Sequence, residues 1–209
     1  MAKNRENTTK SAEDIGAEVI AEMDREFHES SDRVIAIVGA AYLDSMLERL
    51  LRQVFIEAPD EVERLLRPDS PLGSNGSRYE IAYCLGLITR DQRHDLKVIA
   101  KIRNTFAHDF KANSFDVPPV RDFCASLRQP AVLAAMPTQL VSATTAETMA
   151  KYVCDITATP REKYRMSIIM LFGSLLRRIK YVRRADPNSW FSYNPDSLVG
   201  PQSHEPSGG

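Results

Sequence analysis

Residues 32–56 read DRVIAIVGAAYLDSMLERLLRQVFI, and this proline-free stretch decides the fold class. Its apolar side chains return every three or four positions, which is the spacing of one helical face. They are Ile35, Val38, Tyr42, Leu43, Met46, Leu47, Leu50, Leu51, Val54 and Phe55. The stretch therefore predicts one long helix with a wide apolar face to bury. No segment of the chain sustains a period-two alternation, so we expect an all-α fold, and no internal repeat is visible.

Helix signals recur on both sides of this stretch. Between Ser11 and His28 an apolar residue falls at every fourth position, which predicts an amphipathic helix capped by Ser11. The sequence TPRE at 159–162 joins an N-cap, a proline at the first helical position and a glutamate at the third, so a helix should run from there to about Arg184. Further helices are predicted over residues 60–67, 77–87, 90–110, 118–127 and 146–156, with irregular structure over 129–145.

The length and composition of the chain fit one domain. It has 209 residues, 43% of them hydrophobic, which is enough for one sizeable core. We place the domain at residues 11–185, between a disordered tail at 1–10 and a mostly disordered tail at 186–209. The first residues hold no signal-peptide core, and the longest apolar run, Ser167–Leu176, is too short to span a bilayer. We therefore expect a cytoplasmic protein that does not enter the membrane.

Charge and cysteine content narrow the chemistry further. The formal net charge is −1 and the pI about 6.4, so any contact with nucleic acid must be local. Cys84, Cys124 and Cys154 lack the spacing of metal ligands, so we expect reduced core thiols and neither a metal nor another cofactor. Motifs for a catalytic triad and for a phosphate-binding glycine loop are also missing from the sequence.

The helix predicted over residues 90–110 holds the candidate site. Thr89 and Gln92 form a capping box that opens it. Its inward stripe is expected to comprise Leu96, Ile99, Ile102, Phe106 and Phe110. The polar residues at its C-terminal end should then face away from the core.

Arg103, Asn104 and His108 in the sequence KVIAKIRNTFAHD, residues 97–109, are the candidate catalytic residues. Arginine keeps its positive charge while histidine exchanges a proton near neutral pH, a pair that suits a phosphodiester. Asn104 and His108 share a helical face, whereas Arg103 lies about 140° from His108 and reaches it only through its long side chain. The alternative is an ordinary helix end, at which His108 caps carbonyls and Arg103 forms an ion pair.

The pattern Arg-Asn-x-x-x-His at 103–108 resembles the signature of the HEPN superfamily of helical nucleotide-binding domains. A wider stretch is similar to the mannitol operon repressor (MtlR) family over roughly residues 30–128. It comprises SPLGS at 70–74, RYEIAYCLGLI at 78–88 and the Arg103 helix. Between them, NGS at 75–77 replaces what is usually a more helical junction. The resemblance implies a HEPN-like helical bundle with additional N- and C-terminal helices.

The resemblance leaves two functions open. The family name implies a repressor-type transcriptional regulator, but the sequence has no recognition-helix motif, so we expect a protein partner rather than direct DNA recognition. HEPN ribonucleases use the arginine and histidine of this motif to cleave RNA without a metal, usually across a dimer. The alternative is therefore a toxin-type or phage-defence endoribonuclease acting through Arg103 and His108. HEPN domains also commonly pair, which predicts a homodimer.

Two charge clusters have both a structural and a functional interpretation. Asp44 and Glu48 are one helical turn apart and form either a solvated face or the acidic partner of Arg103. Five cations fall within residues 177–184 and complement the dipole of a helix end or contact nucleic-acid phosphates, with Tyr181 able to stack on a base. These cations are Arg177, Arg178, Lys180, Arg183 and Arg184.

Overall fold

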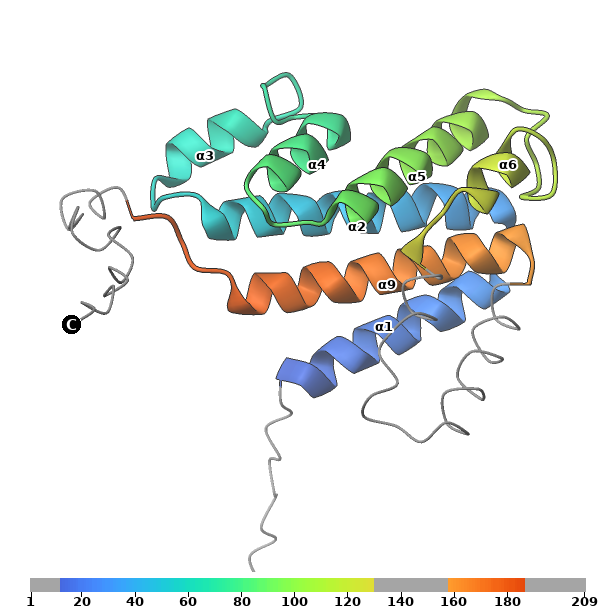
Figure 1. Ribbon diagram of the computed structural model, residues 1–209, viewed down its shortest axis with the longest axis horizontal. Coiled ribbons are helices and arrows are strands. Elements are labelled where there is room, and N and C mark those ends of the chain that lie inside the picture. Colours follow the sequence, from blue (N-terminus) through green and yellow to red (C-terminus); the bar gives the residue numbers. More distant parts are fainter. Residues whose placement is uncertain (1–11, 130–157, 187–209) are drawn as a thin grey trace, which may run out of the picture.

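The computed structural model describes residues 12–129 and 158–186, and the regular elements in these two stretches are all α-helices (Figure 1). The helices are α1 (Ala12–Glu29), α2 (Asp32–Val54), α3 (Pro59–Leu66), α4 (Asn75–Cys84), α5 (Arg90–His108), α6 (Val120–Ala125) and α9 (Pro160–Tyr181). The all-α prediction is confirmed. The predicted tails, the irregular segment 129–145 and the helix 146–156 lie outside the described residues, apart from the first residue of that segment and Asp186.

Helix α2 is the centre of the fold, as its apolar pattern predicts. Its side chains at Ile35, Leu43, Leu47, Leu50 and Leu51 are almost completely shielded from solvent. In Figure 1, α9 lies along one side of α2, with α1 beyond it, and α4 and α5 cover the other side. This arrangement buries α2 between two layers of helices.

Helices α2 and α9 run parallel, and contacts along their whole length fix their register. Arg161 forms an ion pair with Asp32 at the start of both helices. One turn later the Tyr164 hydroxyl donates to the Ala36 carbonyl at 2.9 Å. Gly39 then admits Ile168, whose Cγ1 would lie 3.2 Å from a Cβ added to the glycine. A larger residue than glycine would therefore push α9 away from the centre of the core.

An aromatic cluster joins α5 and α9 to the loop that follows α5. The ring centroids of Phe106 and Phe115 are 5.0 Å apart, and those of Phe115 and Tyr164 are 4.9 Å apart. All three side chains are fully buried. Burial also raises the pKa of the Tyr164 hydroxyl, which therefore remains a hydrogen-bond donor at any physiological pH.

The predicted helix caps are confirmed where the signal was a complete motif. Thr89 and Gln92 form the reciprocal capping box of α5, and the Thr159 hydroxyl accepts the backbone N–H of Glu162 at 3.1 Å. Helix α4, in contrast, is capped by Ser74 and begins at Asn75, so the predicted start at residue 77 was wrong. The NGS junction instead forms its first turn.

Three other predictions were wrong in detail. Phe110, expected in the inward stripe of α5, is 93% exposed because the helix ends at His108 and the chain changes direction. Cys84, expected in the core, is exposed at the end of α4, whereas Cys124 is a buried free thiol. Helix α9 ends at Tyr181, short of the predicted Arg184. Cys154 lies outside the described residues.

Burial raises the pKa of the Cys124 thiol to about 12, so this cysteine stays protonated and unreactive.

In the described residues no helix combines the length and the apolar composition needed to cross a membrane.

Gly86 and Gly76 form a matched pair for testing the backbone of this region. Gly86 has a φ of +69°, whereas Gly76 is helical and the nearest heavy atom to an added Cβ would be 3.6 Å away. We expect Gly86→Ala to lower the free energy of unfolding by about 1 kcal/mol, because alanine is strained in the left-handed region. Gly76→Ala should leave it unchanged or raise it by about 0.5 kcal/mol. Urea unfolding measures the free energy of unfolding of both variants. An equal loss in the two would contradict the left-handed backbone conformation at Gly86.

Candidate functional site

Helix α5 presents Arg103, Asn104 and His108 to solvent. Its opposite side is held in the core by Leu96, Ile99, Ile102 and Phe106, which are all buried. The three polar side chains are exposed at the C-terminal end of the helix. The prediction that they lie on the outer surface of this helix is confirmed, while their catalytic role stays a prediction.

The structure brings Arg103 and Asn104 together but leaves His108 apart. Arg103 Nη1 donates to Asn104 Oδ1 at 2.9 Å. His108 has no hydrogen bond or ion pair to any residue in the described part of the chain. It therefore does not cap carbonyls, and Arg103 forms no ion pair there, so the alternative of an ordinary helix end fails in both details.

Arg33 of α2 performs the capping at this helix end and is a residue that the sequence did not single out. Its guanidinium donates to the carbonyls of Phe106, Asp109 and Ala112, which lie at and just beyond the end of α5. A cation is favoured at the C-terminal end of a helix, where carbonyl groups lack intrahelical partners. Arg33 thereby fixes the turn that carries His108 relative to α2.

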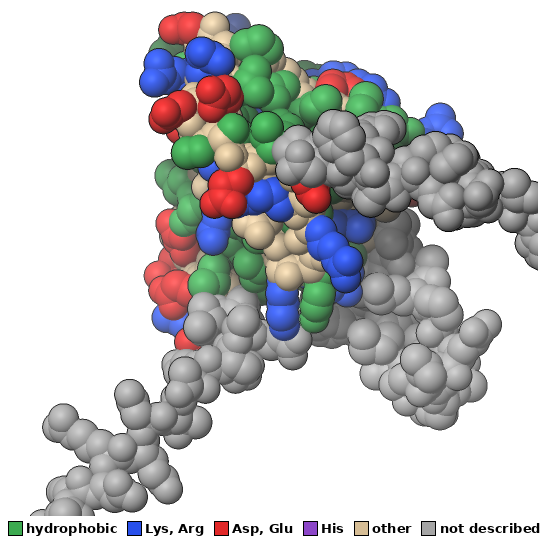
Figure 2. All heavy atoms as spheres, turned by 90° about the vertical axis from the view of Figure 1, so that its left-hand side faces the viewer, with side chains coloured by type: hydrophobic (Ala, Val, Ile, Leu, Met, Phe, Trp, Pro, Cys, Tyr) green, Lys and Arg blue, Asp and Glu red, His purple; other side chains and the backbone are tan. Residues whose placement is uncertain are grey.

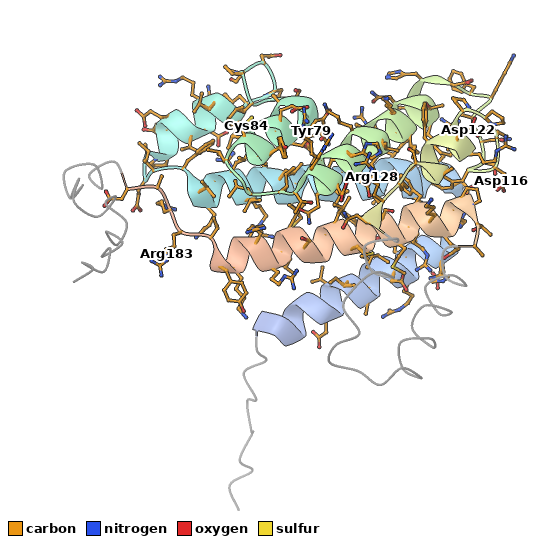
Figure 3. All side chains as sticks on the ribbon, in the orientation of Figure 1. Tyr79, Cys84, Asp116, Asp122, Arg128 and Arg183 are labelled. Atoms are coloured by element: carbon orange, nitrogen blue, oxygen red, sulfur yellow. The ribbon has the colours of Figure 1, made fainter. Side chains whose placement is uncertain are left out.

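Arg103 and Asn104 form one wall of an open groove with a cavity volume of about 560 Å³. Helix α2 supplies its floor, and the start of α4 with the preceding loop supplies the opposite wall. Tyr79, labelled in Figure 3, belongs to the α4 wall. The lining residues are Ile37, Ala40, Ala41, Asp44, Gly73, Ser74, Asn75, Gly76, Tyr79, Ala100, Arg103 and Asn104. His108 does not line this groove.

Gly73 shapes the loop wall of the groove. A Cβ at this position would lie 2.1 Å from the Arg67 carbonyl oxygen and 2.3 Å from the Pro68 carbonyl oxygen. Only glycine fits there without moving backbone, so the close turn before α4 depends on it.

Asp44 and Glu48 pair with Arg78 of α4, and not with Arg103. Arg78 Nη1 donates to Asp44 Oδ2 at 2.9 Å, and Arg78 Nη2 lies 3.0 Å from Glu48 Oε2. The Arg78 side chain is only 7% exposed, and it also donates to the carbonyls of Leu66 and Leu72. The hypothesis that one of these acids holds Arg103 was wrong, because a buried arginine on α4 takes both.

Two buried side-chain oxygens of residues that line the groove have no hydrogen-bond partner among the described residues. Asp44 Oδ1 and Asn75 Oδ1 are each buried, and both residues line the groove. Leaving a buried acceptor unsatisfied costs on the order of 1–3 kcal/mol. Both atoms are closed to solvent, so this cost belongs to the packing beneath the groove and not to its open surface.

The earlier turns of α5 are engaged in structural contacts. Lys97 and Arg93 bind the Glu80 carboxylate of α4, at 2.7 Å and 2.6 Å, and these two cations lower the pKa of Glu80. Lys101 Nζ lies 5.8 Å from the ring centroid of Phe123. Arg93, Lys97 and Lys101 of α5 thus contact neighbouring helices.

Asp95 is a buried structural acid that the sequence did not reveal. Its carboxylate accepts the backbone N–H groups of Arg128 and Gln129 at 2.8–3.0 Å. Burial raises the pKa of Asp95, because removal from water penalises the charged form more than these two donors favour it. Asp95 ties α5 to the segment after α6, far from the groove.

The cations at residues 177–184 lie at the other end of the molecule from His108. Figure 3 labels Arg183, which points away from the helices at the C-terminal end of α9.

No cluster of three or more potential metal ligands occurs in the described stretches.

A sequence model of the mannitol repressor family matches residues 25–171. The chain belongs to the mannitol repressor family. The match covers α2 to α6 completely and continues into α9, so the groove and the end of α5 lie within the region that defines the family. The additional helix α1 begins before it.

A solved structure supports the same fold. It is a chain of the X-ray structure of the MtlR–HPr complex from Escherichia coli, with a TM-score of 0.56 and 21% sequence identity. The alignment covers 75% of the present chain and 97% of that chain. No curated protein sequence matches the chain. The finer resemblance to HEPN domains stays a prediction.

We expect Arg78→Ala to lower the free energy of unfolding by about 2–3 kcal/mol. The change leaves Asp44 without its cation, while Glu48 keeps Arg52 at 2.8 Å. The expected loss lies below the usual cost of breaking a buried pair because both acids are about a third exposed. Arg49→Ala, at an exposed position of the same helix as Asp44, is the control and should change it by less than about 0.5 kcal/mol. Equal unfolding midpoints in urea for the two variants would contradict this role of Arg78.

Proposed function

We propose that the protein is a regulator of the mannitol repressor type that acts in the cytoplasm through a protein partner. Membership of the family over residues 25–171 is the observation that carries the proposal. The relative of similar fold is described in complex with HPr, which makes HPr the candidate partner for this chain. Direct DNA recognition is disfavoured by the net charge of −1 and by the lack of a recognition-helix motif in the sequence.

The groove between α2, α4 and α5 is the surface we propose for the partner. Ile37 at its floor is 37% exposed, and Val34 on the preceding turn of α2 is 42% exposed. Apolar contacts of this kind supply affinity when a partner covers them. Arg103, which has no carboxylate partner in the described part of the chain, also lines the groove, so an apolar centre and an available cation coincide there.

Binding of purified HPr to the full chain, measured by isothermal titration calorimetry, tests this proposal. We expect binding by the wild type and at least a tenfold loss in Ala41→Arg, which fills the groove from an exposed position of α2. Ser45→Arg adds the same side chain one turn later, outside the groove, and should stay within twofold. Wild type that fails to bind HPr at about 100 μM would contradict the partner, and equal loss in both variants would contradict the surface.

The second candidate is the metal-independent endoribonuclease, and the exposed Arg-Asn-x-x-x-His motif supports it. Arg103 has no carboxylate partner in the described part of the chain, so its charge is available to a phosphate. In this mechanism His108 would exchange the proton of a ribose 2′-hydroxyl, Arg103 would stabilise the phosphorane-like transition state, and Asn104 would orient the phosphate. Because His108 lies outside the groove, a homodimer that brings two motifs together is part of this proposal.

Cleavage of a mixed panel of labelled RNAs in EDTA tests the ribonuclease. If it operates, Arg103→Ala and His108→Ala should each lower the rate more than about a hundredfold. Lys101→Ala, an exposed cation one half-turn earlier, should have little effect. Circular dichroism verifies that all variants fold. Intact RNA with wild-type protein would refute the nuclease and leave the HPr proposal untouched.

A further inference from the structure

We propose that the basic end of α9 is a binding site for single-stranded nucleic acid. This site is separate from the groove and does not depend on the function proposed for it. Its centre is a shallow pocket of about 230 Å³ lined by Ser174, Arg177, Arg178 and Tyr181. These residues are spaced at i, i+3, i+4 and i+7, which places them on one face of the helix.

Cations predominate in the chain at this end of α9. From Ser174 to Ala185 the chain contains five cations and no acidic residue. Arg184 lies 3.5 Å from Glu57, but Arg177, Arg178 and Arg183 have no ion pair with any residue that the structure describes. Arginines elsewhere in the fold are mostly held by carboxylates, as Arg78 and Arg165 are. Unpaired guanidinium groups close together favour an anion with several charges.

The first turn of α5 extends the basic face. Gln92 Nε2 donates to Ser174 Oγ at 2.6 Å, which places the start of α5 beside the pocket. Arg90, the first residue of α5, is exposed and has no ion pair in the described part of the chain. Its charge adds to that of α9, so the cations are spread over two helices. A ligand with several phosphates in a row would contact more of them than a single anion would.

Tyr181 gives the face a feature that nucleic acid would use. Its side chain is 65% exposed although it is aromatic, and Lys180 Nζ lies 5.3 Å from its ring centroid. A solvent-exposed ring among arginines is the arrangement on which unpaired bases stack, since every base has a π-face. Figure 2 looks onto this end of the molecule and shows a hydrophobic side chain between Lys and Arg side chains.

Two other polyanions fit the face less well. An anionic membrane would favour an amphipathic helix with several apolar side chains to insert. Among the described residues of this face, Tyr181 is the one large apolar side chain that is more than half exposed. An acidic protein would match the charge but would leave the ring without a flat partner. The site is therefore assigned to single strands, with the other two ligands as outcomes of the test.

Fluorescence anisotropy with a labelled oligothymidylate of about 20 nucleotides tests the assignment on the full chain. DNA lacks the 2′-hydroxyl, so the measurement is independent of any RNA cleavage. With four or five phosphate contacts, tripling the salt concentration should weaken binding about 20- to 50-fold. Arg177→Glu/Arg178→Glu should weaken it at least tenfold. Arg49→Glu/Arg64→Glu makes the same change in net charge at exposed positions of α2 and α3 and should stay within twofold.

Tyr181 separates stacking from charge. Tyr181→Ala should weaken binding about tenfold, whereas Tyr181→Phe, which keeps the ring, should stay within twofold. The site is overturned if the wild type does not bind at about 100 μM or if the two double variants weaken equally. It is likewise overturned if duplex DNA, polyglutamate or vesicles containing phosphatidylserine bind as tightly as the single strand at the same salt concentration.

Discussion

The fold depends on the parallel packing of α9 against α2. Parallel helices cannot be joined by a short turn, so a long stretch of chain separates the end of α2 from the start of α9. Arg161, Tyr164 and Ile168 meet α2 at successive turns, and the glycine at position 39 makes the closest approach possible. With one side of α2 closed by α9, α4 and α5 are left to cover the opposite side, and the groove forms where these three helices meet.

The same constraint explains why the motif of α5 is exposed and divided. Ile99, Ile102 and Phe106 must face α2, which turns the side chains between them outward. Arg103 and Asn104 then line the groove, while His108 lies one turn further along α5 and does not line it. Arg33 holds this helix end through three carbonyls, so it sets the direction of the last turn without touching the polar side chains. A single copy of the chain offers a binding groove more readily than a complete catalytic centre.

The sequence predicted the helices, which depend on neighbouring residues, but it did not predict the contacts that depend on packing between helices. Helical periodicity and the two threonine caps predicted α1, α2, α5 and α9 because those signals are local. Phe110 was misplaced because the periodic pattern continues past the residue at which Arg33 and Asp109 end the helix. The partner of Asp44 could not be predicted either. A sequence does not show that the arginine on α4 is buried beside the acid while the one on α5 is exposed. Only the fold shows which of them reaches the acid.

The ion pairs show which arginines hold the fold together and which have a charge that a ligand could meet. Arg78, Arg93, Arg161 and Arg165 join helices through carboxylates, so they are committed to the fold. Arg103 on α5 and Arg177, Arg178 and Arg183 at the end of α9 have no such partner in the described residues, whereas Arg184 lies 3.5 Å from Glu57. A ligand at either place meets charge that the fold does not need. The groove offers one such cation beside apolar side chains, which suits a protein surface. The end of α9 offers several cations around an exposed ring, which suits a flexible polyanion. The two proposed sites share no lining residue, so neither proposal requires the other.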